Sequence, residues 1–131
     1  MKHEIKLTPE NFRGKSLLIT TPAYGGMVNS TFALSIATLC KYLQGLNIEH
    51  DVFFLNNESL ISRGRNTCVA RFMSLYNFTH MIFIDADTEF QSEDVLKFLH
   101  SDKDVLTGPV PLKRLPITRV AISWRKNFCQ K

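Results

Sequence analysis

Short apolar runs alternate with segments of helical periodicity along most of the chain. Runs rich in Leu, Ile, Val and Phe predict four strands, at residues 16–20, 48–55, 81–84 and 104–107. Apolar side chains that recur every three or four positions predict three helices, at residues 30–44, 65–76 and 92–99. This alternation predicts an α/β fold, a three-layer α/β/α sandwich around a mainly parallel sheet.

Turn and cap residues support these boundaries. Pro22 and the Gly25–Gly26 pair follow the first strand, and Asn29 or Ser30 is a suitable N-cap for the first helix. Gly45 is expected to stop that helix. Gly108 and Pro109 are expected to close the last strand, and no element is predicted for residues 115–131.

Length and composition fit a single domain over residues 1–131. The chain has 44% apolar and 21% charged residues, which excludes a disordered tail or a fibre. The longest apolar runs, such as Met81–Ile84, are far shorter than the ~20 residues needed to cross a bilayer, and residues 1–6 lack a signal-peptide core. Three cysteines without a Cys-x-x-Cys pair argue against a disulfide framework or structural zinc. We expect a cytoplasmic protein, in the host cytoplasm if the source is viral.

The charge is distributed unevenly. Residues 1–108 carry 10 basic and 12 acidic side chains, whereas residues 109–131 carry six basic side chains and no acidic one. A basic tail of this kind, divergent over residues 115–131, is typical of a solvated end. It is also compatible with contact to nucleic acid, anionic lipid or phosphorylated ligands.

Candidate chemistry is concentrated in three segments that follow predicted strands. In parallel α/β sheets, ligands bind beyond the carboxyl ends of the strands, so residues 21–27, 59–66 and 85–90 are expected to converge.

The pattern in the third segment is Ile82-Phe83-Ile84-Asp85-Ala86-Asp87. Two carboxylates at the end of a hydrophobic strand repel each other unless a cation joins them. Carboxylate, water and phosphate oxygens suit Mg²⁺ or Mn²⁺, so Asp85 and Asp87 are the predicted metal ligands. The alternative is a polar turn with a helix-capping aspartate.

The other two segments offer phosphate and base contacts. We expect a helix to begin at Arg63-Gly64-Arg65-Asn66, where free amides and guanidinium groups attract phosphate. Two arginines that only face solvent would give the same sequence pattern. In residues 21–26 the glycines allow close backbone approach, and Tyr24 could stack on a planar base. The loop matches neither a dinucleotide-binding fingerprint nor a Walker A sequence. Together the three segments predict a site for a metal-bound nucleoside diphosphate.

The motifs resemble those of GT-A glycosyltransferases. The order is Thr-Pro-Ala-Tyr-Gly-Gly, then Leu-Ile-Ser-Arg-Gly-Arg-Asn, then Ile-Phe-Ile-Asp-Ala-Asp-Thr-Glu-Phe, then Asp-Val-Leu-Thr-Gly-Pro-Val-Pro-Leu-Lys. It is similar to that of the family-2-like nucleotide-diphospho-sugar transferases of viruses and bacteria over about residues 15–114. The resemblance implies a Rossmann-like nucleotide-binding half and a transferase that takes a nucleotide-diphospho-sugar, with a UDP-sugar as the default donor, and passes the sugar to a glycan, protein or lipid acceptor.

The resemblance also implies residue roles. Asp87 would ligate Mn²⁺ or Mg²⁺ directly, and Asp85 would contact the ribose or a metal-bound water. The implied nucleotide-sugar-binding residues are Thr21, Pro22, Ala23, Tyr24, Arg63, Arg65, Asn66, Asp85, Ala86 and Asp87. Family members usually continue into an acceptor-binding half with another metal ligand and a catalytic base. This sequence has no acidic residue after Asp104 and no histidine after His100, so no catalytic base is assigned.

Three other functions compete with an active transferase. One is a remnant that binds the nucleotide sugar without turnover. Another is a nucleic-acid-binding module that uses the basic tail. The third, a dehalogenase-type phosphatase, is disfavoured because Glu89 occupies the position where its Asp-x-Asp-x-Thr/Val motif requires Thr or Val. An unfinished sheet edge would also favour self-association.

Overall fold

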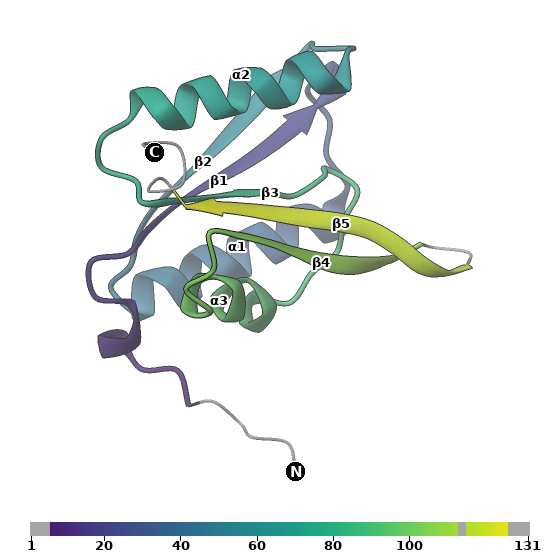
Figure 1. Cartoon of the computed structure of the whole chain (residues 1–131). Helices are drawn as coiled ribbons and strands as arrows, with labels where there is room; N and C mark the ends of the chain where they lie inside the picture. The colour runs from purple at the N-terminus through teal and green to yellow at the C-terminus, as the bar shows by residue number, and fades with distance from the viewer. Residues whose placement is uncertain (1–5, 113–114, 126–131) are drawn as a thin grey trace.

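The computed structural model describes residues 6–112 and 115–125, which form one mixed sheet covered on both faces by helices (Figure 1). The strands are β1 (Ser16–Ala23), β2 (Glu49–Asn56), β3 (His80–Phe83), β4 (Val105–Leu112) and β5 (Leu115–Arg125). The helices are α1 (Ser30–Gly45), α2 (Ile61–Ser74) and α3 (Ser92–His100), with short 3₁₀ turns η1 (Pro9–Phe12) and η2 (Tyr24–Gly26).

The strand order is β2-β1-β3-β5-β4. β1 pairs in parallel with both β2 and β3, while β5 runs antiparallel to both β3 and β4. Only β5 is therefore reversed relative to the other four strands. This confirms the predicted α/β class with a mainly parallel sheet.

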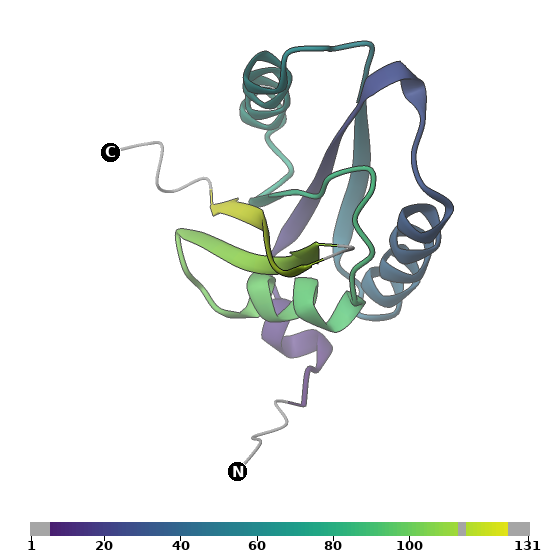
Figure 2. The ribbon, with the colours of Figure 1, turned by 90° about the vertical axis from the view of Figure 1, so that its right-hand side faces the viewer.

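Two apolar clusters, one on each face of the sheet, make the three layers. On one face, Leu17 and Ile19 of β1 pack with Phe32 and Leu39 of α1 and with Leu96 of α3. On the other face, Leu18 of β1 packs with Cys68 and Phe72 of α2. Figure 2 shows α1 and α2 on opposite sides of β1 and β2. The alternation along β1 thus directs successive side chains into opposite layers.

The first strand is longer than its apolar run predicts. β1 continues through Thr21, Pro22 and Ala23, because each of these residues stays in parallel register with β2. The expected loop at residues 21–23 is therefore strand, and the turn begins only at Tyr24.

The second helix begins four residues earlier than predicted and ends two residues earlier. It starts at Ile61, and Gly64, expected at the helix entrance, lies buried within it against Glu58 and Leu55. Its buried face comprises Gly64, Cys68 and Phe72. Tyr76, the last residue of the predicted helix, lies beyond its observed end and is 97% exposed.

The last described part of the chain is a hairpin of β4 and β5. β4 was expected to close at Gly108–Pro109, but it runs on to Leu112. It is an edge strand, where prolines are tolerated because half of the backbone amides have no strand partner. Residues 115–125, predicted as part of a divergent tail, form β5, an interior strand between β3 and β4, whereas residues 126–131 lie outside the described ranges. Among the described residues, no helix has the length and apolar character to cross a membrane.

Candidate functional site

A cavity of about 800 Å³ lies at the carboxyl ends of the parallel strands. The three segments expected to converge all reach it, from the ends of β1, β2 and β3. Its lining residues are Pro22, Tyr24, Met27, Asn29, Glu58, Ser59, Leu60, Ile61, Gly64, Arg65, Asp85, Ala86 and Asp87. The parallel arrangement of β1–β3 explains this convergence, since their carboxyl ends share one edge.

The two aspartates follow β3 in a tight turn. The amide of Ile84 donates to the Thr20 carbonyl (3.1 Å), which extends the pairing with β1 by one residue. The amide of Thr88 then donates to the Asp85 carbonyl (3.0 Å), which closes the turn. Asp85 is half-buried and Asp87 is exposed, and both line the cavity. The turn thus presents two carboxylates to one site.

The segment after β1 forms the opposite wall. Gly25 has φ 69°, a left-handed conformation that glycine adopts without steric cost, and it turns the chain at the rim. The amide of Asn29 donates to the Ala86 carbonyl (3.0 Å), so this wall is tied to the aspartate turn. The Tyr24 side chain is 73% exposed and lines the cavity. An exposed aromatic face is available there to a planar group.

The third wall is the amino-terminal turn of α2. The first helical hydrogen bond runs from the Gly64 amide to the Leu60 carbonyl (2.9 Å). The amides of residues 61–63 precede that bond and have no partner within the helix. Leu60, Ile61 and Gly64 line the cavity, so this end of the helix borders it. Free amides and the helix dipole both favour an anion at this place.

Arg65 connects α2 to the aspartate turn. Its Nη2 lies 3.5 Å from Oδ1 of Asp85, and its guanidinium carbon lies 5.8 Å from the centre of the Phe83 ring. The ring limits the movement of the guanidinium group, and the ion pair places a positive charge beside one carboxylate. The cavity therefore combines the guanidinium group of Arg65, two carboxylates and the amino terminus of a helix.

Four of the predicted residues do not line this cavity. Thr21 and Ala23 are fully buried, because the alternation of β1 turns them away from Pro22 and Tyr24. Asn66 is exposed on α2. Arg63 pairs with Glu58 instead of facing the cavity, with its Nε 2.8 Å from Glu58 Oε2. Binding roles for the six that line it, namely Pro22, Tyr24, Arg65, Asp85, Ala86 and Asp87, stay predictions.

The structure adds lining residues that motif reasoning missed. Glu58, Ser59, Leu60 and Ile61 belong here because α2 starts earlier than its apolar periodicity indicates. Met27 lies in the expected segment, but its apolar side chain gave no sign of a binding role. Met27 is 76% exposed, and Ile61 of α2 is 69% exposed, so apolar side chains border the charged residues of the cavity.

The donor set can be compared with what a divalent cation requires. No group of three or more His, Cys, Asp or Glu side chains suited to a metal occurs within residues 6–112 and 115–125. A metal held by protein side chains alone would need such a group. Mg²⁺ and Mn²⁺ are commonly held by one or two carboxylates together with water and substrate phosphates. Asp85 and Asp87 fit a cation that is bound together with a diphosphate.

Comparisons with known proteins give matches at the level of structure. No protein-family model matches the chain, and no curated relative matches it. The viral protein A197 from STIV superposes with a TM-score of 0.56 and 16% identity, covering 88% of this chain and 68% of that one. A protein from Desulfovibrio desulfuricans G20, described as a "putative nucleotide-diphospho-sugar transferase", superposes with a TM-score of 0.52 and 14% identity, covering 86% of this chain and 64% of that one.

At these identities the likeness establishes the fold. The described residues adopt a Rossmann-like α/β fold similar to that of the Desulfovibrio neighbour. The chain spans about two thirds of the length of each neighbour.

Proposed function

We propose that the cavity binds a nucleotide-diphospho-sugar together with Mg²⁺ or Mn²⁺, and that the protein acts as a glycosyltransferase or as its donor-binding domain. The observation that carries the proposal is the meeting of Asp85 and Asp87 with Arg65 and the amino terminus of α2 around one cavity. Anion-attracting and cation-attracting groups side by side match a metal-bound diphosphate, which presents both charges. The fold of the Desulfovibrio neighbour supports the same ligand class.

Each part of the ligand has a counterpart in the cavity. The carboxylates of Asp85 and Asp87 would hold the cation, which supplies charge neutralisation at the departing diphosphate. The Arg65 guanidinium group and the free amides of α2 would contact phosphate oxygens. Tyr24 would stack on the base, with UDP as the default nucleotide. The cavity volume of about 800 Å³ lies within the ordinary range for small-molecule sites.

The direct test is thermal unfolding with UDP or GDP, each with and without Mn²⁺ or Mg²⁺. At a ligand concentration 100 times Kd, binding adds ~2.7 kcal/mol of stability. For 131 residues this corresponds to a rise in Tm of about 10 °C, at an unfolding entropy of ~2.1 cal/mol/K per residue. We expect this rise only when metal and nucleotide are both present.

Variants locate the site. Asp87→Asn should lose most of the metal-dependent rise, because an amide is a much weaker ligand for a hard cation. The matched control is Glu89→Gln, which removes an exposed carboxylate from the same loop outside the cavity lining and should keep the rise. If neither nucleotide shifts the Tm of the wild type with either metal, the proposal is wrong.

Turnover is tested separately, by measuring UDP release from UDP-sugars. Release that depends on metal and disappears in Asp87→Asn supports an active transferase. Nucleotide binding without release identifies a donor-binding domain.

A further inference from the structure

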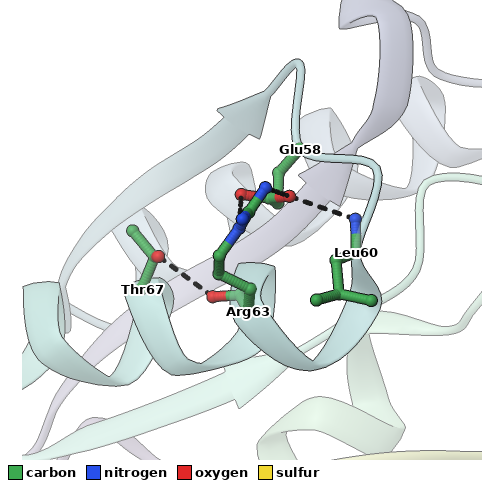
Figure 3. Close-up of polar contacts among 4 residues, drawn as sticks. All are labelled: Glu58, Leu60, Arg63 and Thr67. Atoms are coloured by element: carbon green, nitrogen blue, oxygen red, sulfur yellow. Dashed lines mark hydrogen bonds and ion pairs between the residues drawn. The ribbon is translucent and has the colours of Figure 1, made fainter.

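Glu58 and Arg63 form a bidentate ion pair at the amino end of α2 (Figure 3). Nε of Arg63 donates to Oε2 of Glu58 and Nη2 of Arg63 donates to Oε1, both at 2.8 Å. The amide of Leu60 donates to the same Oε1 at 3.0 Å. The hydrogen bonds from Arg63 and Leu60 hold the pKa of Glu58 below its usual range, so the carboxylate is charged at neutral pH.

Glu58 also packs tightly on the helix. A Cβ atom added at Gly64 would lie 3.3 Å from Cγ of Glu58 and 3.4 Å from Cδ2 of Leu55. Gly64 therefore allows the Glu58 side chain to approach the helix backbone, while the Leu60 and Arg63 bonds fix the carboxylate. Glu58 thus ties the segment between β2 and α2 to the first turn of the helix.

The two partners differ in position. Glu58 lines the cavity and its side chain is 17% exposed, whereas Arg63 lies outside the lining and its side chain is 67% exposed. A carboxylate therefore lies at the edge of a site whose proposed ligand is a diphosphate. Without a partner, that negative charge would repel the ligand and compete with it for the helix amides.

From this arrangement we propose that Glu58 and Arg63 are positioning residues for the diphosphate. Arg63 promotes ligand binding through Glu58, by neutralising the carboxylate and by holding it away from the α2 amides, and it does not itself contact the phosphates. This inference rests on the proposed function, since it concerns the same site.

The test is a double-mutant cycle on the affinity for UDP with Mn²⁺, measured by titration calorimetry on wild type, Arg63→Met, Glu58→Gln and the double variant. Arg63→Met should weaken affinity roughly three- to tenfold, because the released Glu58 carboxylate can then turn toward the α2 amides and compete with the phosphates for them. In the Glu58→Gln background, the same loss of Arg63 should change affinity by less than about twofold, because the substituted amide side chain keeps the Leu60 hydrogen bond without the charge.

Salt and stability provide readouts that separate electrostatics from packing. The deficit of Arg63→Met should shrink between low and high salt, because the Glu58 carboxylate that loses its Arg63 partner borders an open cavity, where charges are screened within ~10 Å at 0.1 M. The Tm of each unliganded variant shows whether the helix end is intact. A deficit that follows the Tm and ignores salt would indicate a purely structural role and overturn the inference.

The remaining outcomes are also decisive. If Arg63→Met weakens binding as strongly in the Glu58→Gln background as in the wild type, Arg63 acts on the ligand independently of Glu58 and the inference is wrong while the proposed function stands. If the wild type binds neither UDP nor GDP with metal, the proposed function fails and the inference fails with it.

Discussion

The packing of β4 on α3 can be tested at a single glycine. Gly108 of β4 is buried, and a Cβ atom added there would overlap Cζ of Phe98 on α3, with Cε1 and Cε2 each 3.3 Å away. Because the ring is rigid, its Cζ atom moves only if the whole Phe98 side chain rotates. The substitution Gly108→Ala therefore forces Phe98 out of its place between the helix and the sheet.

The magnitude follows from the cost of overpacking. One extra methyl group in a tightly packed site costs roughly 1–3 kcal/mol. For 131 residues, at ~2.1 cal/mol/K of unfolding entropy per residue, this lowers Tm by about 4–11 °C. Thermal unfolding followed by circular dichroism measures the shift directly.

Two companion variants control the experiment. Gly45→Ala, in the last turn of α1, adds a Cβ with nothing within 4 Å and should leave Tm unchanged or slightly higher. Adding Phe98→Leu to Gly108→Ala should recover part of the loss, because the shorter side chain leaves room for the methyl group. A Gly108→Ala variant that melts within about 2 °C of the wild type, at the resolution of such a measurement, would show that Phe98 does not cover β4.

Three further predictions concern the core, the base contact and acid stability. Phe72→Ala should lower Tm by about 10–18 °C in a melting scan, because truncating a buried Phe costs ~3–5 kcal/mol. Tyr24→Ala should weaken UDP affinity in calorimetry about three- to tenfold, the equivalent of a lost aromatic contact, with little change in Tm, while Tyr76→Ala should change neither. Glu58 has a lowered pKa, so the stability it contributes is full above the unfolded value of ~4.3 and is lost as pH falls below it. Tm measured from about pH 5 to pH 3 should therefore drop more in the wild type than in Glu58→Gln, and parallel curves would contradict this.

The sequence predicts the first three strands and three helices well because their apolar patterns are strong. Leu17 and Ile19 of β1 face one apolar cluster and Leu18 faces the other. The apolar residues of α1 lie on a single face of the helix, which packs into the first cluster. Those elements bring the candidate segments together through the geometry of parallel strands, so the position of the cavity is also predictable.

The hairpin is less predictable because its signals conflict. Gly108 and Pro109 are typical of a turn, yet on an edge strand they are accommodated within β4. The β-branched residues of β5, such as Ile117, Val120 and Ile122, indicate a strand. Arg119 interrupts that pattern, and one of the two partners of β5, the strand β3, is distant in sequence.

Details of the site depend on contacts that no local pattern contains. Arg63 and Arg65 are chemically alike and two positions apart, but on a helix that spacing turns them in different directions. One therefore pairs with Glu58 and the other with Asp85. Only the start of α2 at Ile61 decides which of them borders the cavity.

The place of β5 between β3 and β4 has a consequence for the order in which the molecule assembles. Every residue that lines the cavity precedes Thr88, whereas β3 gains its second neighbour only from residues 123–125. During synthesis all residues that line the cavity are therefore made while one side of β3 still offers open backbone groups to any other strand. Closure by the hairpin comes last and depends on pairing between residues some 40 positions apart, which is slow compared with local contacts. The returning strand thus covers the open side of β3 after all residues that line the cavity have been made.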